Sequence, residues 1–218
     1  MKKRLVFSTG AGMSAESGIS TFRDAGGLWE NYPVMEVASH DGYLRNPALV
    51  HEFYNQRRRQ LVEAVPNAGH AGIAALEEDD LHERAGSSKV LHLHGELMKV
   101  RAVDDENKVY TLEPGCMDTT PDTVIDGCHV RPHIVFFQEA VPNMEQASRL
   151  AADADIFVII GTSLAVYPAA NLLHYVRRGV PVYYIDPNPA AVPPGVRVMR
   201  MGASEGVARL TEMLKIGK

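Results

Sequence analysis

The sequence predicts an α/β protein in which a doubly wound parallel sheet carries a small inserted lobe. Two observations lead to this prediction. Short apolar runs alternate with segments of helical periodicity at both ends of the chain, and residues 97–130 interrupt this alternation with hairpin-like pieces. We therefore expect residues 1–96 and 131–218 to form one domain and residues 97–130 to form the inserted lobe. With 218 residues, the chain is long enough to bury a substantial core.

The individual elements follow from the length and composition of each segment. Five apolar runs have the length of buried parallel strands: residues 5–7, 90–93, 134–137, 156–160 and 182–185. Helices are predicted over residues 47–65, 68–78, 144–152, 168–178 and 204–214. Asn46 and Ser204 are suitable N-caps for two of them. In the lobe, residues 97–103 and 108–112 have the alternation of hairpin strands.

Composition narrows the class of protein. Apolar residues make up 45% and charged residues 22% of the chain, as in ordinary globular proteins. The formal charge of -5 and the pI near 6.0 argue against a nucleic-acid-binding surface. We find neither a membrane-spanning run nor a signal-peptide core, and two cysteines are too few for a disulfide framework. A cytoplasmic protein without membrane or nucleic-acid partners is expected.

The strongest local motif is a glycine-rich turn after the first predicted strand. Gly10-Ala11-Gly12 begins a G-x-G-x-x-[G/A] pattern between a strand and a predicted helix, as in Rossmann-like dinucleotide-binding folds. Gly10 permits a tight turn, and Gly12 lets a pyrophosphate approach the main chain. The alternative is a glycine turn that merely links strand and helix. Residues 21–29 have the composition of a long loop rather than of a second Rossmann strand, which argues against a dehydrogenase.

A longer stretch around this turn carries a family resemblance. Residues 10–23, G-A-G-M-S-A-E-S-G-I-S-T-F-R, resemble the signature of the sirtuins. The similarity continues in the family's order through residues 81–86, 94–96, 131–132, 161–163 and 168–170, so it covers nearly the whole chain. The resemblance implies an enzyme that uses NAD as a co-substrate to remove acyl groups from lysine in proteins or peptides, and it suggests a monomer.

The resemblance also implies which residues bind NAD. They are Gly10, Ala11, Gly12, Phe22, Arg23, Trp29, Asp79, Gly161, Thr162, Ser163, Asp186 and Ala203. Asp186 lies where the family usually has Asn, and its carboxylate can still accept a hydrogen bond from a ribose hydroxyl. By itself, the segment from Gly161 to Ser163 would be interpreted as an ordinary strand-end turn.

One histidine is the expected catalytic residue. His94-Gly95 matches the family's catalytic His-Gly, and an imidazole that titrates near neutral pH can accept a proton from a ribose hydroxyl. By analogy, the products are free lysine, nicotinamide and O-acyl-ADP-ribose. His92 is interpreted as structural. Two alternatives remain open, namely an impaired module that only binds NAD or ADP-ribose, and a mono-ADP-ribosyltransferase.

Tyr54 and Arg57 indicate which acyl groups are accepted. They are three residues apart on a predicted helix and so share one face, where a guanidinium and a phenol can bind a carboxylate together. The pair resembles the Y-x-x-R signature of class III sirtuins, which favour succinyl and malonyl groups. The alternative is a charged helix face, because Arg57 is followed by two further arginines.

The sequence departs from the family in the inserted lobe. Sirtuins commonly hold zinc there with four cysteines, but this chain has only Cys116 and Cys128, so Asp118, His129 or His133 would have to replace the others. We therefore predict no zinc and a lobe held by hairpin packing. Gln138 replaces a common glycine in a loop that pairs with the substrate peptide in the family.

A second departure concerns a strand of the main sheet. The family's strand ending in T-Q-N-[IV]-D has no counterpart between the helix at 68–78 and Leu81, and the match of Asp79 to the motif's Asp is ambiguous. Losing a central strand would leave its neighbours without hydrogen-bond partners. We therefore expect that about ten residues are missing from this sequence between Leu76 and Leu81.

Overall fold

The computed structural model describes residues 3–21, 32–74, 84–86 and 89–215. The chain divides into two compact units. The first consists of Met1–Thr21, Val65–Leu91 and Asn143–Lys218, and the second of Phe22–Ala64 and His92–Pro142. Each unit has its own sheet. No helix within these described ranges is both long and apolar enough to span a bilayer.

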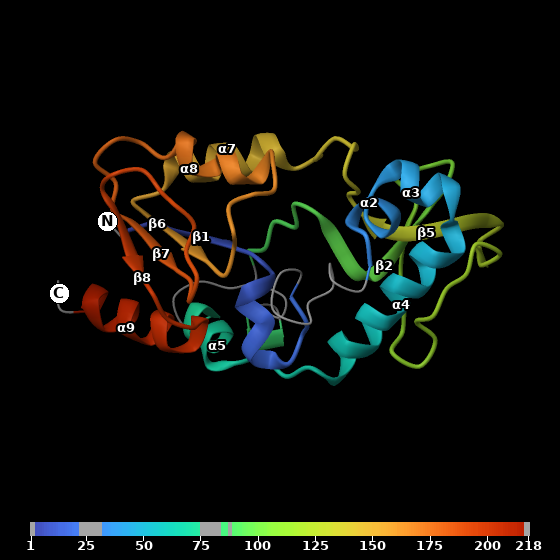
Figure 1. Ribbon diagram of the computed structural model, residues 1–218, viewed down its shortest axis with the longest axis horizontal. Helices are drawn as coiled ribbons and strands as arrows, with labels where there is room; N and C mark the ends of the chain where they lie inside the picture. The colour runs from blue at the N-terminus through green and yellow to red at the C-terminus, as the bar shows by residue number, and fades with distance from the viewer. Residues whose placement is uncertain (1–2, 22–31, 75–83, 87–88, 216–218) are drawn as a thin grey trace. The chain divides into compact units, whose positions relative to one another are not determined.

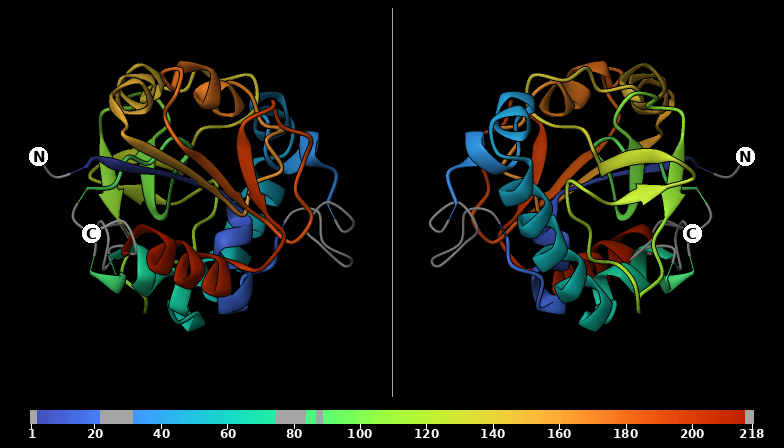
Figure 2. Two further views of the ribbon diagram at one scale, coloured as in Figure 1. Left: turned by 90° about the vertical axis from the view of Figure 1, so that its left-hand side faces the viewer. Right: turned by 90° about the vertical axis from the view of Figure 1, so that its right-hand side faces the viewer.

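The first unit is built on a four-stranded parallel sheet. Its order is β1 (Leu5–Thr9), β6 (Ile156–Ile160), β7 (Val182–Ile185) and β8 (Val196–Met199). Helices α7 (Met144–Asp153) and α8 (Leu172–Tyr175) cover one face, and α5 (Ala68–Ala74) and α9 (Ala203–Lys215) cover the other, as Figure 1 and Figure 2 show. The predicted doubly wound fold is confirmed.

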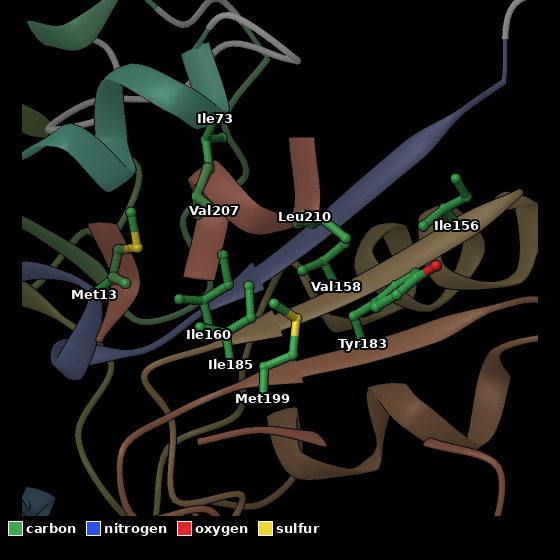
Figure 3. Close-up of a cluster of buried hydrophobic side chains, with 11 residues drawn as sticks. Met13, Ile73, Ile156, Val158, Ile160, Tyr183, Ile185, Met199, Val207 and Leu210 are labelled. Carbon is green, nitrogen blue, oxygen red and sulfur yellow. The ribbon is translucent and has the colours of Figure 1, made fainter. Parts of the chain in front are cut away.

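The core of this unit lies between the sheet and the pair α5 and α9 (Figure 3). Val207 and Leu210 of α9 are fully buried against Val158 and Ile160 of β6, and Ile73 reaches the same cluster from α5. Each such side chain contributes roughly 1.5 to 3 kcal/mol through burial. Because every residue of β6 is buried, its sequence is apolar throughout, which made the strand recognisable.

Several predicted elements differ in the structure. Residues 90–93 are not in a strand and are only half-buried, and β8 was not predicted. The helix predicted over 168–178 is shorter, with the 3₁₀ helix η2 (Ala169–Asn171) leading into α8. Residues 134–137 do not add to the parallel sheet, because the strand there is antiparallel and ends at Ile134.

The second unit contains the antiparallel sheet. Its order is β3 (Val109–Thr111), β2 (Gly95–Ala102), β5 (Cys128–Ile134) and β4 (Val124–Ile125), close to the predicted hairpins. The unit also includes α2 (Val34–Val37), α3 (His40–Arg45) and α4 (Pro47–Glu63), so it extends beyond the lobe expected over 97–130. Asn46 caps α4 as predicted, since its side-chain oxygen accepts a hydrogen bond from the Leu49 N–H (3.1 Å).

Candidate functional site

Two glycine turns pack against each other at the carboxyl ends of β1 and β6. The Gly10 N–H donates to the Ile160 carbonyl and the Gly12 N–H to the Gly161 carbonyl, both at 2.9 Å. A Cβ added to Gly10 would lie 2.6 Å from the Gly161 oxygen, and one added to Gly12 would lie 2.9 Å from the Gly161 Cα. Packing between the turns therefore already requires glycine at positions 10 and 12, apart from any ligand.

The helix predicted after this turn is present as a 3₁₀ helix, η1 (Ala11–Ser17). Two of its first N–H groups have partners in the protein. Gly12 donates to Gly161, and Met13 donates to the Gly10 carbonyl (3.0 Å). The Ala11 N–H comes first in the helix and so has no acceptor within it, which makes it the donor of this turn best suited to a ligand.

The other NAD-binding candidates of the first unit lie at the same edge of the sheet. Gly161, Thr162 and Ser163 follow β6, Asp186 follows β7, and the buried Ala203 begins α9 just after β8. The Thr162 carbonyl accepts a hydrogen bond from the Tyr184 hydroxyl (2.6 Å), and an Asp186 carboxylate oxygen accepts one from the Asn188 N–H (2.8 Å). Ligands of open α/β sheets bind at this edge.

The chemical groups at this edge fit NAD. The Ala11 N–H and the hydroxyl groups of Thr162 and Ser163 are of the kinds that bind phosphate oxygens. The Asp186 carboxylate is an acceptor for ribose hydroxyls. These residues would hold the nucleotide, while Phe22, Arg23, Trp29 and Asp79 and the junction between Leu76 and Leu81 lie outside the described residues.

Sequence reasoning missed a polar network beneath the glycine turn. The Asn67 side-chain N–H₂ donates to the Met13 carbonyl (2.9 Å) and to the Ser17 hydroxyl (3.2 Å). Its oxygen accepts hydrogen bonds from the N–H groups of Gly69 and His70 at the start of α5. His70 is fully buried, and its Nε2 lies 3.3 Å from the Ser14 hydroxyl. An Asn just before a predicted helix was the available signal.

Glu16 supports the start of α9. Its carboxylate accepts a hydrogen bond from the Ser204 N–H (3.3 Å), and a Cβ on Gly202 would lie 2.2 Å from the same carboxylate oxygen. The helix begins at Ala203, so Ser204 is not its N-cap as predicted. The acidic side chain that satisfies this helix end comes from η1 instead, which couples the glycine turn to the position expected near adenine.

His94 belongs to the second unit and lies directly before β2. Its carbonyl accepts a hydrogen bond from the Val135 N–H (3.0 Å). Gly95 has a φ of +87°, and the nearby His133 carbonyl leaves no space for a side chain on it. The strand pairing of β2 and β5 therefore requires glycine at position 95, whereas His94 takes part in it only through its main chain. The His94 side chain reaches the surface, yet partial burial lowers its pKa from the ordinary value, which favours the neutral imidazole that a general base needs.

Tyr54 and Arg57 lie on the buried side of α4. Only 6% of Tyr54 and 7% of Arg57 is exposed. The Tyr54 ring packs edge-on against Phe53 (centroids 5.0 Å apart) and at a tilt of 32° against Phe136 (6.0 Å). Burial raises the pKa of Tyr54 and lowers the pKa of Arg57, the latter effect being opposed by the neighbouring Tyr54. A buried guanidinium of this kind is an anion-binding group.

The loop after β5 is fixed to the start of α3. Phe137 pairs with Ser39 in a parallel bridge, and its carbonyl accepts the His40 N–H (3.0 Å). Gln138 has a φ of +77°, a left-handed conformation that favours glycine, and its side chain bonds twice to Asp41. The Gln138 Nε2 donates to the Asp41 carboxylate (2.8 Å), while the Asp41 N–H donates to the Gln138 Oε1 (3.1 Å).

Helix α4 also holds the loop that contains Thr119. The fully buried Arg58 donates to the Leu97 carbonyl (2.7 Å) and to the Thr119 hydroxyl (3.2 Å), and Asn55 exchanges two hydrogen bonds with the Thr119 main chain. Arg59 pairs with Asp118. These bonds link the lobe to the helix in addition to the predicted hairpin packing. The alternative of a charged, solvated helix face therefore holds for Arg59 but not for Arg57 and Arg58.

Two of the residues considered as replacement metal ligands have partners in the protein, whereas the buried Nδ1 of the third, His133, has no hydrogen-bond partner among the described residues. Asp118 is paired with Arg59, and His129 Nδ1 lies 3.2 Å from the Pro121 carbonyl. Cys116 is exposed, and Cys128 accepts a long hydrogen bond from Lys108 (3.7 Å). Among the residues with described positions, no group of three or more His, Cys, Asp or Glu side chains could hold a metal ion.

The fold and these residues define an α/β protein of the nucleotide-binding class. The model of the Sir2 family matches residues 10–168, and the chain belongs to the Sir2 family. Two curated relatives bear the name NAD-dependent protein deacylase. The chain is 55% identical to one from Bacteroides thetaiotaomicron, over 97% of this chain and 98% of the relative, and 52% identical to one from Helicobacter pylori, over 85% of each.

Solved structures of Sir2 homologues are also similar to this chain. A Sir2 homologue mutant in complex with ADP-ribose has a TM-score of 0.88 at 34% identity, covering 98% of this chain and 92% of the other. A Sir2 homologue in complex with NAD has a TM-score of 0.85 at 34% identity, and the match covers 98% of this chain and 90% of the other. The recognition of a sirtuin and the expected class of enzyme, an NAD-dependent protein deacylase, are confirmed. The Bacteroides match extends over 229 residues, more than the 218 of this chain, so the relative has residues without a counterpart here.

Proposed function

We propose that the protein transfers acyl groups from protein lysines to the ADP-ribose part of NAD, and that it prefers succinyl and malonyl groups to acetyl groups. The observation that carries the preference is the buried pair on α4, in which the Arg57 guanidinium lies one turn from the Tyr54 phenol. The products are free lysine, nicotinamide and O-acyl-ADP-ribose.

The chemistry of this pair supports an acidic acyl group. A guanidinium loses hydration when it is buried, and a carboxylate offers it two parallel charge-assisted hydrogen bonds in return. In the part of the chain that the structure describes, the Tyr54 hydroxyl has no hydrogen-bond partner, so it can donate to the same carboxylate. An acetyl group has no carboxylate and would gain none of these bonds.

His94 supplies the base. NAD, when bound, supplies the ribose hydroxyl that captures the acyl group once nicotinamide has left. One nitrogen of the neutral His94 imidazole accepts the proton of that hydroxyl and later returns a proton to the product. The lowered pKa of His94 keeps this nitrogen unprotonated at neutral pH. The acid limb of kcat/KM should therefore show an apparent pKa below 6.5, and His94→Ala should lower kcat by about 10²-fold or more.

The preference is tested with one peptide carrying acetyl-, succinyl- or malonyl-lysine. We expect kcat/KM for the succinyl peptide to exceed that for the acetyl peptide. Arg57→Met should lower succinyl activity by about 10- to 100-fold and leave acetyl activity within about threefold, and Tyr54→Phe should have a smaller effect in the same direction. Arg59→Met, on the same helix but exposed and paired with Asp118, is the matched control. Equal losses on all three peptides in Arg57→Met would contradict the proposal.

A second candidate is a protein that binds NAD or ADP-ribose without turnover. Two observations favour it. The Bacteroides relative has residues without a counterpart in this chain, and the T-Q-N-x-D motif is absent from this sequence. Nicotinamide release that depends on the acyl peptide selects the deacylase, and no release at all selects the binding module. Release accompanied by labelling of an acceptor protein selects mono-ADP-ribosyl transfer.

A further inference from the structure

The first unit has a cavity that the proposed reaction does not use. It has a volume of about 550 Å³ and lies beside β8 and α9. Three arginines and three methionines provide most of its lining, namely Arg197, Arg200, Arg209, Met199, Met201 and Met213. These residues follow position 168, where the match to the Sir2 family model ends. The cavity is within the size range of ligand sites in proteins.

The main chain beside this cavity is an open sheet edge. Within the residues that the structure describes, β8 pairs only with β7 and ends the sheet. The Met199 carbonyl accepts a hydrogen bond from the Asp186 N–H (3.2 Å), so the main chain of Met199 faces β7. Alternation along the strand then turns the N–H and carbonyl of Val198 toward the open edge. Val198 is 40% exposed.

The charge of this edge is opposite to that of the chain. The protein has a formal charge of -5, yet three guanidinium groups gather here. Arg197 donates to the Tyr183 hydroxyl (3.0 Å) and lies over its ring, 5.4 Å from the centroid, and is thereby held in place. Arg200 and Arg209 form no ion pair with any other described residue and are exposed. An anionic partner is the complement to this arrangement.

We propose that an acidic segment of a partner protein binds here in extended conformation, adding a strand to the edge of β8. Its main chain would pair with Val198, and its carboxylates would bind Arg200 and Arg209. Apolar side chains on the opposite face of the segment would pack beside the exposed Val198, which alternates with Met199 along β8 and so lies on the face away from α9. A second copy of the chain fits poorly, since antiparallel pairing of two β8 edges would bring Arg197 and Arg200 of both copies together.

The test uses fluorescein-labelled eight-residue peptides and fluorescence anisotropy at 50 mM and 200 mM salt. A peptide of alternating Glu and Val should bind, more weakly at the higher salt, and the corresponding Lys and Val peptide should not. Arg200→Ser combined with Arg209→Ser should lower the affinity at least 10-fold. Val198→Pro, which removes an outward N–H without changing charge, should also lower it at least 10-fold. Arg149→Ser, on the exposed surface of α7, is the control and should bind as the wild type does.

Two further measurements keep the proposal falsifiable. If Val198→Pro is misfolded by circular dichroism, an acidic peptide with alternate amides N-methylated replaces it and should fail to bind the wild-type protein. Unchanged affinity of either the proline variant or the methylated peptide would overturn strand addition, and unchanged affinity of the double arginine variant would overturn the charge assignment. A dimer in sedimentation that Val198→Pro abolishes would also overturn the proposal, because the edge would then bind a second copy.

Discussion

Glu139 binds Arg131 through both carboxylate oxygens, at 2.7 and 3.1 Å. The Arg131 guanidinium also lies 4.1 Å from the centre of the Phe136 ring, and the Phe136 N–H donates to Glu139 (2.9 Å). Burial on its own would raise the pKa of Glu139, but the hydrogen bonds from Arg131 and Phe136 lower it below its ordinary value. One carboxylate thus holds both β5 and the loop that follows it.

Glu139→Gln should lower the free energy of unfolding by about 2 to 4 kcal/mol, because the largely buried Arg131 and Arg101 both lose their anionic partner. Urea unfolding of the purified variant measures this loss. Glu145→Gln removes an exposed ion pair with Arg149 on α7 and should cost less than about 0.5 kcal/mol. Similar losses in both variants would show that the network around Glu139 contributes no more than a surface pair.

Gln138 combines a left-handed backbone with two hydrogen bonds to Asp41. Gln138→Gly loses the bonds but also removes the backbone strain, whereas Gln138→Ala loses the bonds and keeps the strain. The alanine variant should therefore be less stable than the glycine variant by about 1 kcal/mol in urea unfolding. An alanine variant as stable as the glycine variant would mean that the left-handed conformation costs nothing at this position.

His70 should make stability depend on pH. Its burial lowers its pKa from 6.5 to about 4, so the unfolded chain takes up a proton before the folded protein does. The stability contributed by neutral His70 is complete above pH 6.5 and is lost as the pH falls toward 4, by an amount of the order of 3 kcal/mol.

Urea unfolding between pH 7 and pH 4.5 measures this loss. His70→Gln should show a shallower decline than the wild type, and His174→Gln, at an exposed position on α8, should show the same decline as the wild type. An unchanged slope in His70→Gln would rule out His70 as its source.

The lobe should be stable without zinc because α4 holds its loop. Metal analysis of the purified protein should find less than about 0.1 equivalent of zinc, and a chelator should leave the Tm unchanged. Thr119→Val, which removes a partner of His51 and Arg58, should lower the unfolding free energy by about 1 to 3 kcal/mol, with the exposed Thr111→Val as control. One equivalent of bound zinc would overturn this prediction.

Strands that form one continuous apolar run could be predicted from the sequence. Ile156–Ile160 and Val182–Ile185 are strands with the predicted bounds, because a strand buried on both faces is apolar at every residue. Strand β8 was missed because it is short and partly exposed, with Arg197 in its centre. Its edge position tolerates such a residue.

Tertiary contacts account for the other misses. Helices α2 and α3 are short and depend on Ser39 between them, whose hydroxyl donates to the Met35 carbonyl (2.6 Å) and accepts the Gly42 N–H (3.0 Å). A solvated helix face was one interpretation of the arginines at 57–59, because local sequence does not reveal that a distant loop covers Arg58. The motif residues could be named as candidates because they are unusual in sequence, whereas supporting residues such as Asn67 and His70 are not and were missed.

The packing of Gly12 against Gly161 has a practical consequence for mutagenesis. A substitution at Gly12 would push two strand ends apart, so a loss of NAD binding in such a variant would report damage to the sheet as much as the loss of a ligand contact. Ser163 offers a cleaner position, since its side chain makes no hydrogen bond with any other described residue. A calorimetric comparison of Ser163→Ala with the wild type would separate nucleotide affinity from fold integrity.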